Sequence, residues 1–307
     1  MLVTIDTEYV RPQAAAVYLR ISGREAAFIE TNTARALPHL LAALEEHRLD
    51  PSDVRYVIVT HAHLDHAAGA FAVLKACPNA TLLCHPRAKK NLVDPTRLVA
   101  SAVKVYGAET FSELYGSIEP IAEARVRELN DGDEVPLGNV RLRFLHTAGH
   151  AKHHVVVHDE AHDTVFTGDA FGLVYPGLQR AGRFAFPSTS PIDFDAPEAL
   201  KSIERILALR PRSVCLTHFG EYEDLEPIAG QLRRWIEVSQ AAIDECVAAG
   251  RVEAEASLKA TLLDELERAA GKCGLALNAE ERAMVELDMT INAQGLAFVV
   301  GKRLSPS

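Results

Sequence analysis

The stretch from Thr60 to Gly69, THAHLDHAAG, most constrains what this chain can fold into. It places three imidazoles and one carboxylate within six residues, at His61, His63, Asp65 and His66. Burying such groups without partners would cost on the order of several kcal/mol, because each is removed from water. A bound metal ion removes that penalty, since neutral histidine nitrogens and carboxylate oxygens are metal ligands. The stretch therefore predicts a metal site.

The spacing within this stretch favours two metal ions. Residues Val54 to Thr60 are rich in β-branched side chains and predict a buried strand. If His61 and His63 continue the extended backbone, the alternation of side chains places both on one side. Asp65 and His66 are adjacent and cannot share that face, but Asp65 suits the start of a following helix. A second ion close to the first would use both.

Further ligand-type residues follow other predicted strands. Loops beyond strand ends are held in place by the rigid sheet, so functional side chains often gather there. The residues are His150, Asp169 and His218, which follow predicted strands at Val140–His146, Thr164–Thr167 and Ser213–Thr217.

These motifs resemble the metallo-β-lactamase superfamily, over roughly Ala14 to Tyr222. The matching pattern is His-x-His-x-Asp-His followed by a histidine, an aspartate and a histidine, in the family's order. The resemblance implies an α/β fold, the four-layer αββα sandwich. It also implies that one metal is bound by His61, His63 and His150, that the other is bound by Asp65, His66 and His218, and that Asp169 bridges the two.

Two positions narrow the branch of this family that the chain resembles. The true β-lactamases usually carry cysteine where this chain has Asp169, which points away from antibiotic hydrolysis. The diiron flavoprotein branch usually has glutamate where this chain has His63. The pattern therefore favours hydrolytic branches such as glyoxalase-II-like thioesterases, lactonases and phosphodiesterases. Persulfide dioxygenases keep the same histidines with one iron, so oxidative chemistry stays open.

The expected reaction is hydrolysis of a small-molecule ester, thioester or lactone. Two divalent metals can share a water and hold it as hydroxide near neutral pH, while they stabilise the charge that develops on the substrate. Asp65 can also orient that hydroxide or receive a proton, and Tyr175 and Tyr222 are candidate catalytic proton donors. The nitrogen and oxygen ligands suit zinc, with iron or manganese as alternatives. Two other classes stay open: an iron-dependent redox protein and a non-catalytic ligand-binding member of the fold.

Three other histidines flank the predicted site. His153 and His154 lie just past His150. They are expected either to orient a metal-binding side chain without binding the metal themselves, or to be ordinary strand residues. His85 ends a predicted strand on the same edge of the sheet and is a candidate for substrate contact.

Composition argues against several kinds of partner. The formal net charge is −10, from 42 acidic and 32 basic residues, which disfavours a nucleic-acid backbone. No apolar run approaches the ~20 residues of a membrane span, and the N-terminus has no signal-peptide pattern. The five cysteines are scattered without C-x-x-C spacing, as in reduced cytoplasmic proteins. We therefore expect a cytoplasmic protein without a membrane or nucleic-acid partner, and a homodimer is left open.

The predicted organisation is a catalytic domain over residues 1–225 and a helical region over residues 226–307. In the first part, Val126–Leu129 and Val140–His146 are expected to belong to a meander with a turn at Gly138–Asn139, which Val155–Val157 and Thr164–Thr167 continue. Ala170–Ser190 is expected to form a long surface loop whose apolar side chains either line a substrate pocket or cover the sandwich. The helical region could shape the substrate mouth or a dimer interface. Its predicted core stripes are Leu232, Ile236 and Ile243; Leu258, Leu262 and Leu266; and Met284, Leu287 and Ile291.

Overall fold

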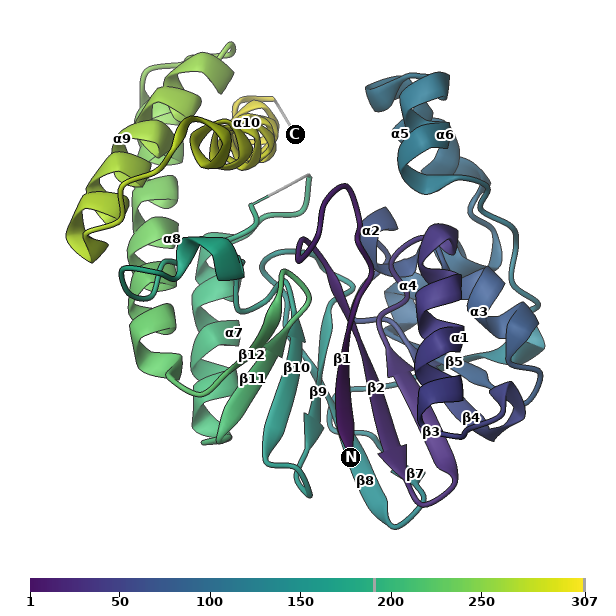
Figure 1. The fold of residues 1–307 in the computed structure, drawn as a ribbon. Coiled ribbons are helices and arrows are strands. Elements are labelled where there is room, and N and C mark those ends of the chain that lie inside the picture. Colours follow the sequence, from purple (N-terminus) through teal and green to yellow (C-terminus); the bar gives the residue numbers. More distant parts are fainter. Residues whose placement is uncertain (190–191, 306–307) are drawn as a thin grey trace. The chain divides into compact units, whose positions relative to one another are not determined.

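The computed structural model describes residues 1–189 and 192–305, which form two compact units (Figure 1). Unit 1 comprises Met1–His146, His153–Gly168 and Pro211–Glu221. Unit 2 comprises Thr147–Lys152, Asp169–Arg210 and Tyr222–Ser307. The units therefore interleave along the chain. The predicted boundary between residues 1–225 and 226–307 stays a prediction.

Unit 1 is built on two six-stranded sheets, with strand orders β1-β2-β3-β4-β5-β6 and β12-β11-β10-β9-β8-β7. Each contains both parallel and antiparallel neighbours, as β2–β3 and β3–β4 show in the first and β9–β10 and β10–β11 in the second. The strands of the first sheet are β1 (Leu2–Asp6), β2 (Ala16–Ser22), β3 (Glu25–Ile29), β4 (Val54–Ile58), β5 (Thr81–Cys84) and β6 (Val126–Glu128). Those of the second are β7 (Glu134–Leu137), β8 (Val140–His146), β9 (Val155–Asp159), β10 (Thr164–Gly168), β11 (Ser213–Leu216) and β12 (Gly220–Tyr222).

Strand β2 shows why the two sheets stack. All seven of its residues are buried, so both of its faces must be covered. Val17 and Leu19 point into a core that they share with the helices on the outer face of the first sheet. Ala16 and Tyr18 point the other way, into a core shared with Phe144 and other residues of the second sheet. The alternation of side chains along one strand thus joins a helical layer to two sheets, as the sandwich prediction requires.

Six α-helices belong to unit 1, and the one that carries Asp65 and His66 is short. The helices are α1 (Leu37–Glu46), α2 (Leu64–Ala67), α3 (Ala70–Ala76), α4 (Pro86–Val93), α5 (Thr96–Tyr106) and α6 (Ala108–Tyr115). Between α2 and α3 the chain passes very close to another backbone segment. A Cβ on Gly69 would lie 2.6 Å from the Thr33 carbonyl oxygen, so only glycine fits there.

The predicted meander is wrong for its first strand. Strand β6 pairs in parallel with β5 in the first sheet, whereas β7 and β8 form an antiparallel pair in the second. The chain changes sheets at the turn that begins at Asn130, where the Asp133 carboxylate accepts the Asn130 N–H at 2.7 Å. The alternation of side chains identifies a strand but does not specify its partner, which explains the error.

The described residues of unit 2 form four α-helices: α7 (Ala196–Ala208), α8 (Leu225–Ala248), α9 (Glu255–Cys273) and α10 (Ala279–Leu304). The predicted stripes of α8 and α9 are buried, which confirms them as core. The stripe predicted for α10 is wrong, because Leu287 is 62% exposed and Ile291 is 37% exposed. The residues of α10 that are buried instead are Val285, Met289, Leu296 and Val300. Apolar residues lie on both sides of this helix, so periodicity alone could not choose between them.

Helix α10 is also the one helix in the described residues that is long and apolar enough to cross a membrane. One such helix is weak evidence, because a core helix of a soluble protein has the same length and composition. In unit 2, α10 packs on α8 and α9 through its buried residues.

The segment predicted as a surface loop contributes to the core of unit 2. Of Ala170–Ser190, Ser190 lies outside the described residues. Phe184 and Phe186 are almost fully buried, and the Phe186 ring lies 6.4 Å from the Trp235 ring of α8. Leu173 and Phe186 also exchange backbone hydrogen bonds, which closes the segment on itself. Its aromatic side chains therefore pack inside this unit and do not form an exposed wall.

Candidate metal centre

His61 and His63 lie just beyond the end of β4 and face each other. Nε2 of His61 lies 2.9 Å from Nδ1 of His63, so the two side chains share one side of the backbone as predicted. Nitrogen ligands on one tetrahedral zinc ion are separated by about 3.3 Å, given Zn–N bonds of ~2.0–2.1 Å. The observed separation is therefore close to that of two ligands of one ion.

Asp65, His66 and His218 form a second group in unit 1. Oδ2 of Asp65 lies 3.6 Å from Nε2 of His66 and 3.3 Å from Nε2 of His218. Their ligand atoms all lie within 4.8 Å of one another, which is close enough to hold one metal ion. Asp65 lies in the first turn of α2, as predicted from its position before an apolar run, and His218 follows β11. Residues about 150 positions apart are thus joined by the fold of one unit.

Hydrogen bonds orient both histidines of this group. Nδ1 of His66 donates to Oε1 of Glu30 at 3.1 Å, and Nδ1 of His218 donates to the Ala14 carbonyl oxygen at 2.9 Å. An acceptor opposite Nδ1 places the proton there and leaves the lone pair on Nε2. Both rings are therefore held in the tautomer that presents Nε2 to a metal, a standard arrangement in metal sites.

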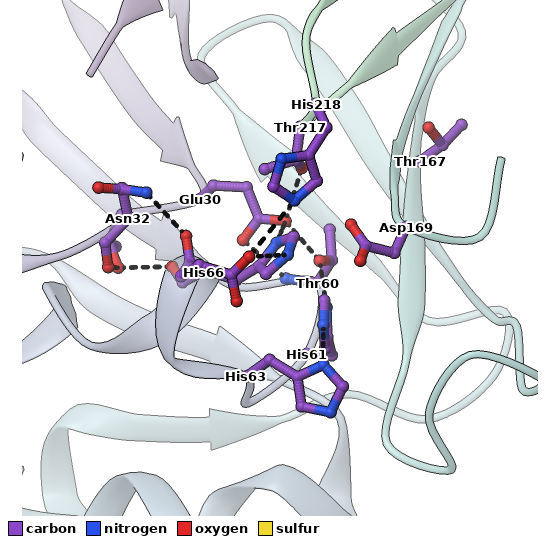
Figure 2. Close-up of polar contacts among 12 residues, drawn as sticks. Glu30, Asn32, Thr60, His61, His63, His66, Thr167, Asp169, Thr217 and His218 are labelled. Atoms are coloured by element: carbon purple, nitrogen blue, oxygen red, sulfur yellow. Dashed lines mark hydrogen bonds and ion pairs between the residues drawn. The ribbon is translucent and has the colours of Figure 1, made fainter. Parts of the chain in front are cut away.

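Glu30 is the residue of this centre that the sequence analysis missed. It is 1% exposed and follows β3, and its carboxylate accepts hydrogen bonds from His66, from the backbone and hydroxyl of Thr60, and from the Thr217 hydroxyl (Figure 2). Its oxygens also lie within 4.8 Å of ligand atoms of His61 and His66. However, three of these donors bond Oε1 and one bonds Oε2, so Glu30 acts here as an orienting group. The sequence feature that could have identified Glu30 is its position as a carboxylate directly after a buried strand.

The segment after Glu30 holds the backbone of the metal loop. The Thr31 hydroxyl donates to the His66 carbonyl oxygen at 2.8 Å, and the Asn32 amide donates to the Asp65 carbonyl oxygen at 2.9 Å. These bonds fix the main chain that carries two predicted ligands, which limits how far their side chains can move.

Unit 2 brings together the two remaining predicted ligands. Nε2 of His150 lies 3.5 Å from Oδ2 of Asp169, and Nδ1 of His150 donates to the Ser188 carbonyl oxygen at 3.0 Å. His150 therefore has the same tautomer as His66 and His218. Each unit assembles its own share of the predicted ligands, five in unit 1 and two in unit 2. The complete set of seven stays a prediction.

His153 and His154 lie beside the metal loop of unit 1. The Ala62 N–H donates to Nδ1 of His153 at 3.3 Å, and the His154 ring lies 4.9 Å from the His61 ring. Both histidines are therefore near a predicted ligand, and the choice between the two expected roles, orienting a ligand or being ordinary residues, stays open. The His85 ring packs against the His146 ring, with centroids 4.1 Å apart and planes tilted by 38°. Burial, with a smaller effect of the His146 charge, lowers the pKa of His85 to about 4.

Tyrosine hydroxyls lie in both units. Tyr175 donates to the Asp288 carboxylate at 3.5 Å, and Tyr222 donates to the Val174 carbonyl oxygen at 2.8 Å. The catalytic roles predicted for these two stay predictions. In unit 1, Tyr9 and Tyr115 pack around α2, and burial together with the Asp65 charge raises the pKa of both phenols. They are neutral groups near a predicted ligand that the sequence analysis did not single out.

The arrangement fits metal binding. Three histidines have Nδ1 bonded to a fixed acceptor, which leaves Nε2 for a metal, and the donor atoms of Asp65, His66 and His218 converge. All the donors are nitrogen or oxygen, a set that suits divalent zinc, iron or manganese.

Comparison with known proteins identifies the family. The sequence model of the family described as the Metallo-beta-lactamase superfamily matches residues 11–218, more than half of the 307-residue chain. The chain belongs to the metallo-β-lactamase superfamily, whose members are typically metal-dependent hydrolases. Its two mixed sheets flanked by helices, followed by a C-terminal helical region, are the expected fold.

Individual relatives agree with this assignment. The metallo-beta-lactamase fold-containing protein ST1585 of Sulfurisphaera tokodaii is 29% identical over 213 residues, which cover 68% of this chain and 74% of the relative. Its crystal structure has a TM-score of 0.65 at 23% identity and covers 96% of this chain and 97% of that one. The metallo-beta-lactamase family protein TTHA1429 of Thermus thermophilus has a TM-score of 0.60 at 21% identity, with 82% of each chain covered. The B3 metallo-beta-lactamase BLEG-1 has a TM-score of 0.54 at 22% identity and covers 72% of this chain and 93% of that one. At these identities the structural similarity shows the fold alone.

Proposed function

We propose that this protein is a metal-dependent hydrolase that uses two metal ions to cleave an ester, a thioester or a lactone. The observation that carries the proposal is the convergence of Asp65, His66 and His218 in unit 1. Two of these side chains are almost completely buried, and hydrogen bonds through Nδ1 hold both histidines with Nε2 directed at the same point as the Asp65 carboxylate. A metal ion is the partner that their donor atoms fit.

In this proposal the predicted ligands are divided between the two ions. His61, His63 and His150 hold one ion, Asp65, His66 and His218 hold the other, and Asp169 is shared. When bound, the metal pair would activate a water and polarise the substrate carbonyl. Zinc is the proposed metal, with iron or manganese as the alternatives.

Asp65 combines metal binding with access to the substrate. Its side chain is 29% exposed, whereas those of His66 and His218 are 0% and 10% exposed. An exposed carboxylate that also faces two ligand nitrogens can orient the attacking water and receive its proton. Asp65 is therefore the proposed general base of the reaction.

A leaving group needs a proton, and tyrosine hydroxyls are the proposed donors. Tyr175 and Tyr222 keep the role predicted for them. In unit 1, Tyr9 is a further candidate, because its phenol stays neutral and packs in the cluster that covers α2. A neutral phenol keeps its proton at physiological pH and can donate a hydrogen bond to a departing oxygen or sulfur.

The proposal is tested by metal content and substrate specificity together. The protein purified without chelator should contain about two metal ions per chain and should hydrolyse at least one compound in a panel of esters, thioesters and lactones. Asp169→Ala should abolish that turnover while the circular dichroism spectrum is retained. Asp244→Ala, on the exposed surface of α8, should leave turnover unchanged. Less than one metal ion per chain would overturn the proposal.

The same measurements distinguish a hydrolase from an iron-dependent redox protein. An iron-dependent redox protein would contain iron, absorb visible light and consume oxygen or a persulfide. A chain that binds zinc and hydrolyses a carboxylic ester excludes that alternative. A chain that binds metal and turns over no compound of either class would be a ligand-binding member of the fold.

A further inference from the structure

Helix α10 carries one buried polar side chain in an otherwise apolar face. Asn292 is 5% exposed and lies among the buried Val285, Met289 and Leu296 of the same helix. Asparagine is unfavourable in a helix interior, and a buried amide must find hydrogen-bond partners. The hydrogen-bond partners of this amide therefore explain why asparagine occupies the position.

The amide of Asn292 clamps a short segment of unit 2. Its Oδ1 accepts the backbone N–H of Thr189 at 2.8 Å, and its Nδ2 donates to the carbonyl oxygen of Pro187 at 2.9 Å. The Thr189 hydroxyl donates to the backbone carbonyl oxygen of Asn292 at 3.1 Å. Both neighbours of Ser188 are thereby tied to α10 by three hydrogen bonds.

The residue between them contacts a predicted metal ligand. The Ser188 carbonyl oxygen accepts a hydrogen bond from Nδ1 of His150 at 3.0 Å. A carbonyl can only accept, so Nδ1 must carry the proton and Nε2 must keep its lone pair. That Nε2 lies 3.5 Å from Oδ2 of Asp169, the other predicted ligand in this unit.

We propose that Asn292 is a positioning residue for His150. By holding Pro187 and Thr189, it fixes the Ser188 carbonyl that selects the metal-binding tautomer and orientation of the His150 ring. Asparagine is suited to this role because one planar amide supplies both the acceptor for Thr189 and the donor for Pro187. A side chain of the C-terminal helical region thus controls the orientation of a predicted metal ligand. The proposal rests on the proposed function only in taking His150 as a metal ligand.

The first test uses the metal-free protein, so that it does not depend on activity. Long-range ¹H–¹⁵N spectra of histidine-labelled protein report the tautomer of each ring, and His150→Gln identifies the His150 signal. We expect His150 to be the Nδ1–H tautomer in the parent protein and a mixture of tautomers in Asn292→Ala. Asn292→Asp keeps the acceptor for Thr189 but lacks the donor for Pro187, so it should lie between the two.

The second test measures affinity for zinc by competition with a chromophoric chelator. Loss of a group that orients a metal ligand weakens metal binding by ~10–100-fold, and an indirect contact belongs at the lower end. Asn292→Ala should therefore weaken one of the two zinc sites by about 10-fold. Val285→Ala, fully buried on the same helix, is the matched control and should retain both the tautomer and the affinity.

The outcomes are distinguishable. A folded Asn292→Ala protein with the parent tautomer and the parent zinc affinity would overturn the proposal, and so would equal losses in Val285→Ala. If Asn292→Ala does not fold, Thr189→Val removes only the hydroxyl bond to Asn292 and should still broaden the tautomer distribution of His150. An unchanged distribution in that variant would also count against the clamp. A parent protein that binds neither zinc, iron nor manganese would refute the proposed function, while the tautomer measurement would still decide the role of Asn292.

Discussion

Nδ1 of His66 lies 3.1 Å from Oε1 of Glu30, so a carboxylate after β3 orients a predicted ligand on α2. The same carboxylate accepts hydrogen bonds from Thr60, next to His61, and from Thr217, next to His218. Three segments that carry predicted ligands therefore meet on one buried side chain. Glu30 therefore connects the segments that carry the predicted ligands of unit 1.

Replacing Glu30 with glutamine should weaken metal binding without unfolding the protein. A glutamine amide can place a donor opposite Nδ1 of His66, which would move the proton to Nε2, where the metal is expected to bind. We expect a loss of ~10–100-fold in zinc affinity, as for other groups that orient metal ligands. Competition with a chromophoric chelator measures it. Glu25→Gln is the control, because Glu25 begins β3 and its carboxylate accepts a hydrogen bond from the Gly138 N–H. Equal affinities in both variants would contradict the role of Glu30.

Stability should depend on pH through His85. Burial lowers the pKa of this imidazole from 6.5 to about 4, so between these values the folded protein binds fewer protons than the unfolded chain. The contribution of neutral His85 is fully present above about pH 6.5 and is lost progressively as the pH falls towards 4.

The variant that isolates this effect is His85→Asn. In the parent protein the Arg87 N–H donates to Nδ1 of His85 at the start of α4. An asparagine side chain keeps an acceptor for this N–H but does not titrate. In metal-free protein, the free energy of unfolding of the parent should fall more steeply than that of His85→Asn between pH 7 and about pH 4.5. Urea unfolding at several pH values measures both, and parallel curves would show that His85 does not contribute.

The two apolar sides of α10 should differ sharply in their effect on stability. Leu296 is fully buried, and its replacement by alanine should cost about 2–5 kcal/mol through lost contacts and a residual cavity. Leu287 is 62% exposed, so Leu287→Ala should change stability by less than ~0.5 kcal/mol. Chemical denaturation compares the two. Equal losses would mean that Leu287 is covered in solution.

Gly149 should not tolerate a side chain. Its φ is +126°, and a Cβ there would lie 2.3 Å from the Cα of Ala199 on α7. Gly149→Ala should therefore cost ~1–3 kcal/mol and displace the adjacent His150, which lowers zinc affinity as well. Gly177→Ala is the control, because nothing lies within 4 Å of that position. Thermal unfolding and zinc titration of both variants check this, and a parent-like Gly149→Ala would refute the close packing of this turn on α7.

Much of the secondary structure was predictable, because burial on one or two faces leaves a periodic pattern. The strand at Val54 and the buried stripes of α8 and α9 follow from that pattern. Strand β6 could not be placed in the same way, since its pattern is equally compatible with either sheet. For α10 both sides are apolar, and packing against α8 and α9 selects the buried one.

By itself the sequence determined the chemical type of the site. Three imidazoles and a carboxylate within six residues are costly to bury without partners, and a metal ion is a partner that suits all four. The tertiary structure alone decided which side chains orient those ligands. Glu30 meets His66 across 36 residues, and Asn292 meets Thr189 across 103. Such contacts follow no spacing rule, because they depend on how sheets and helices pack after the local elements have formed.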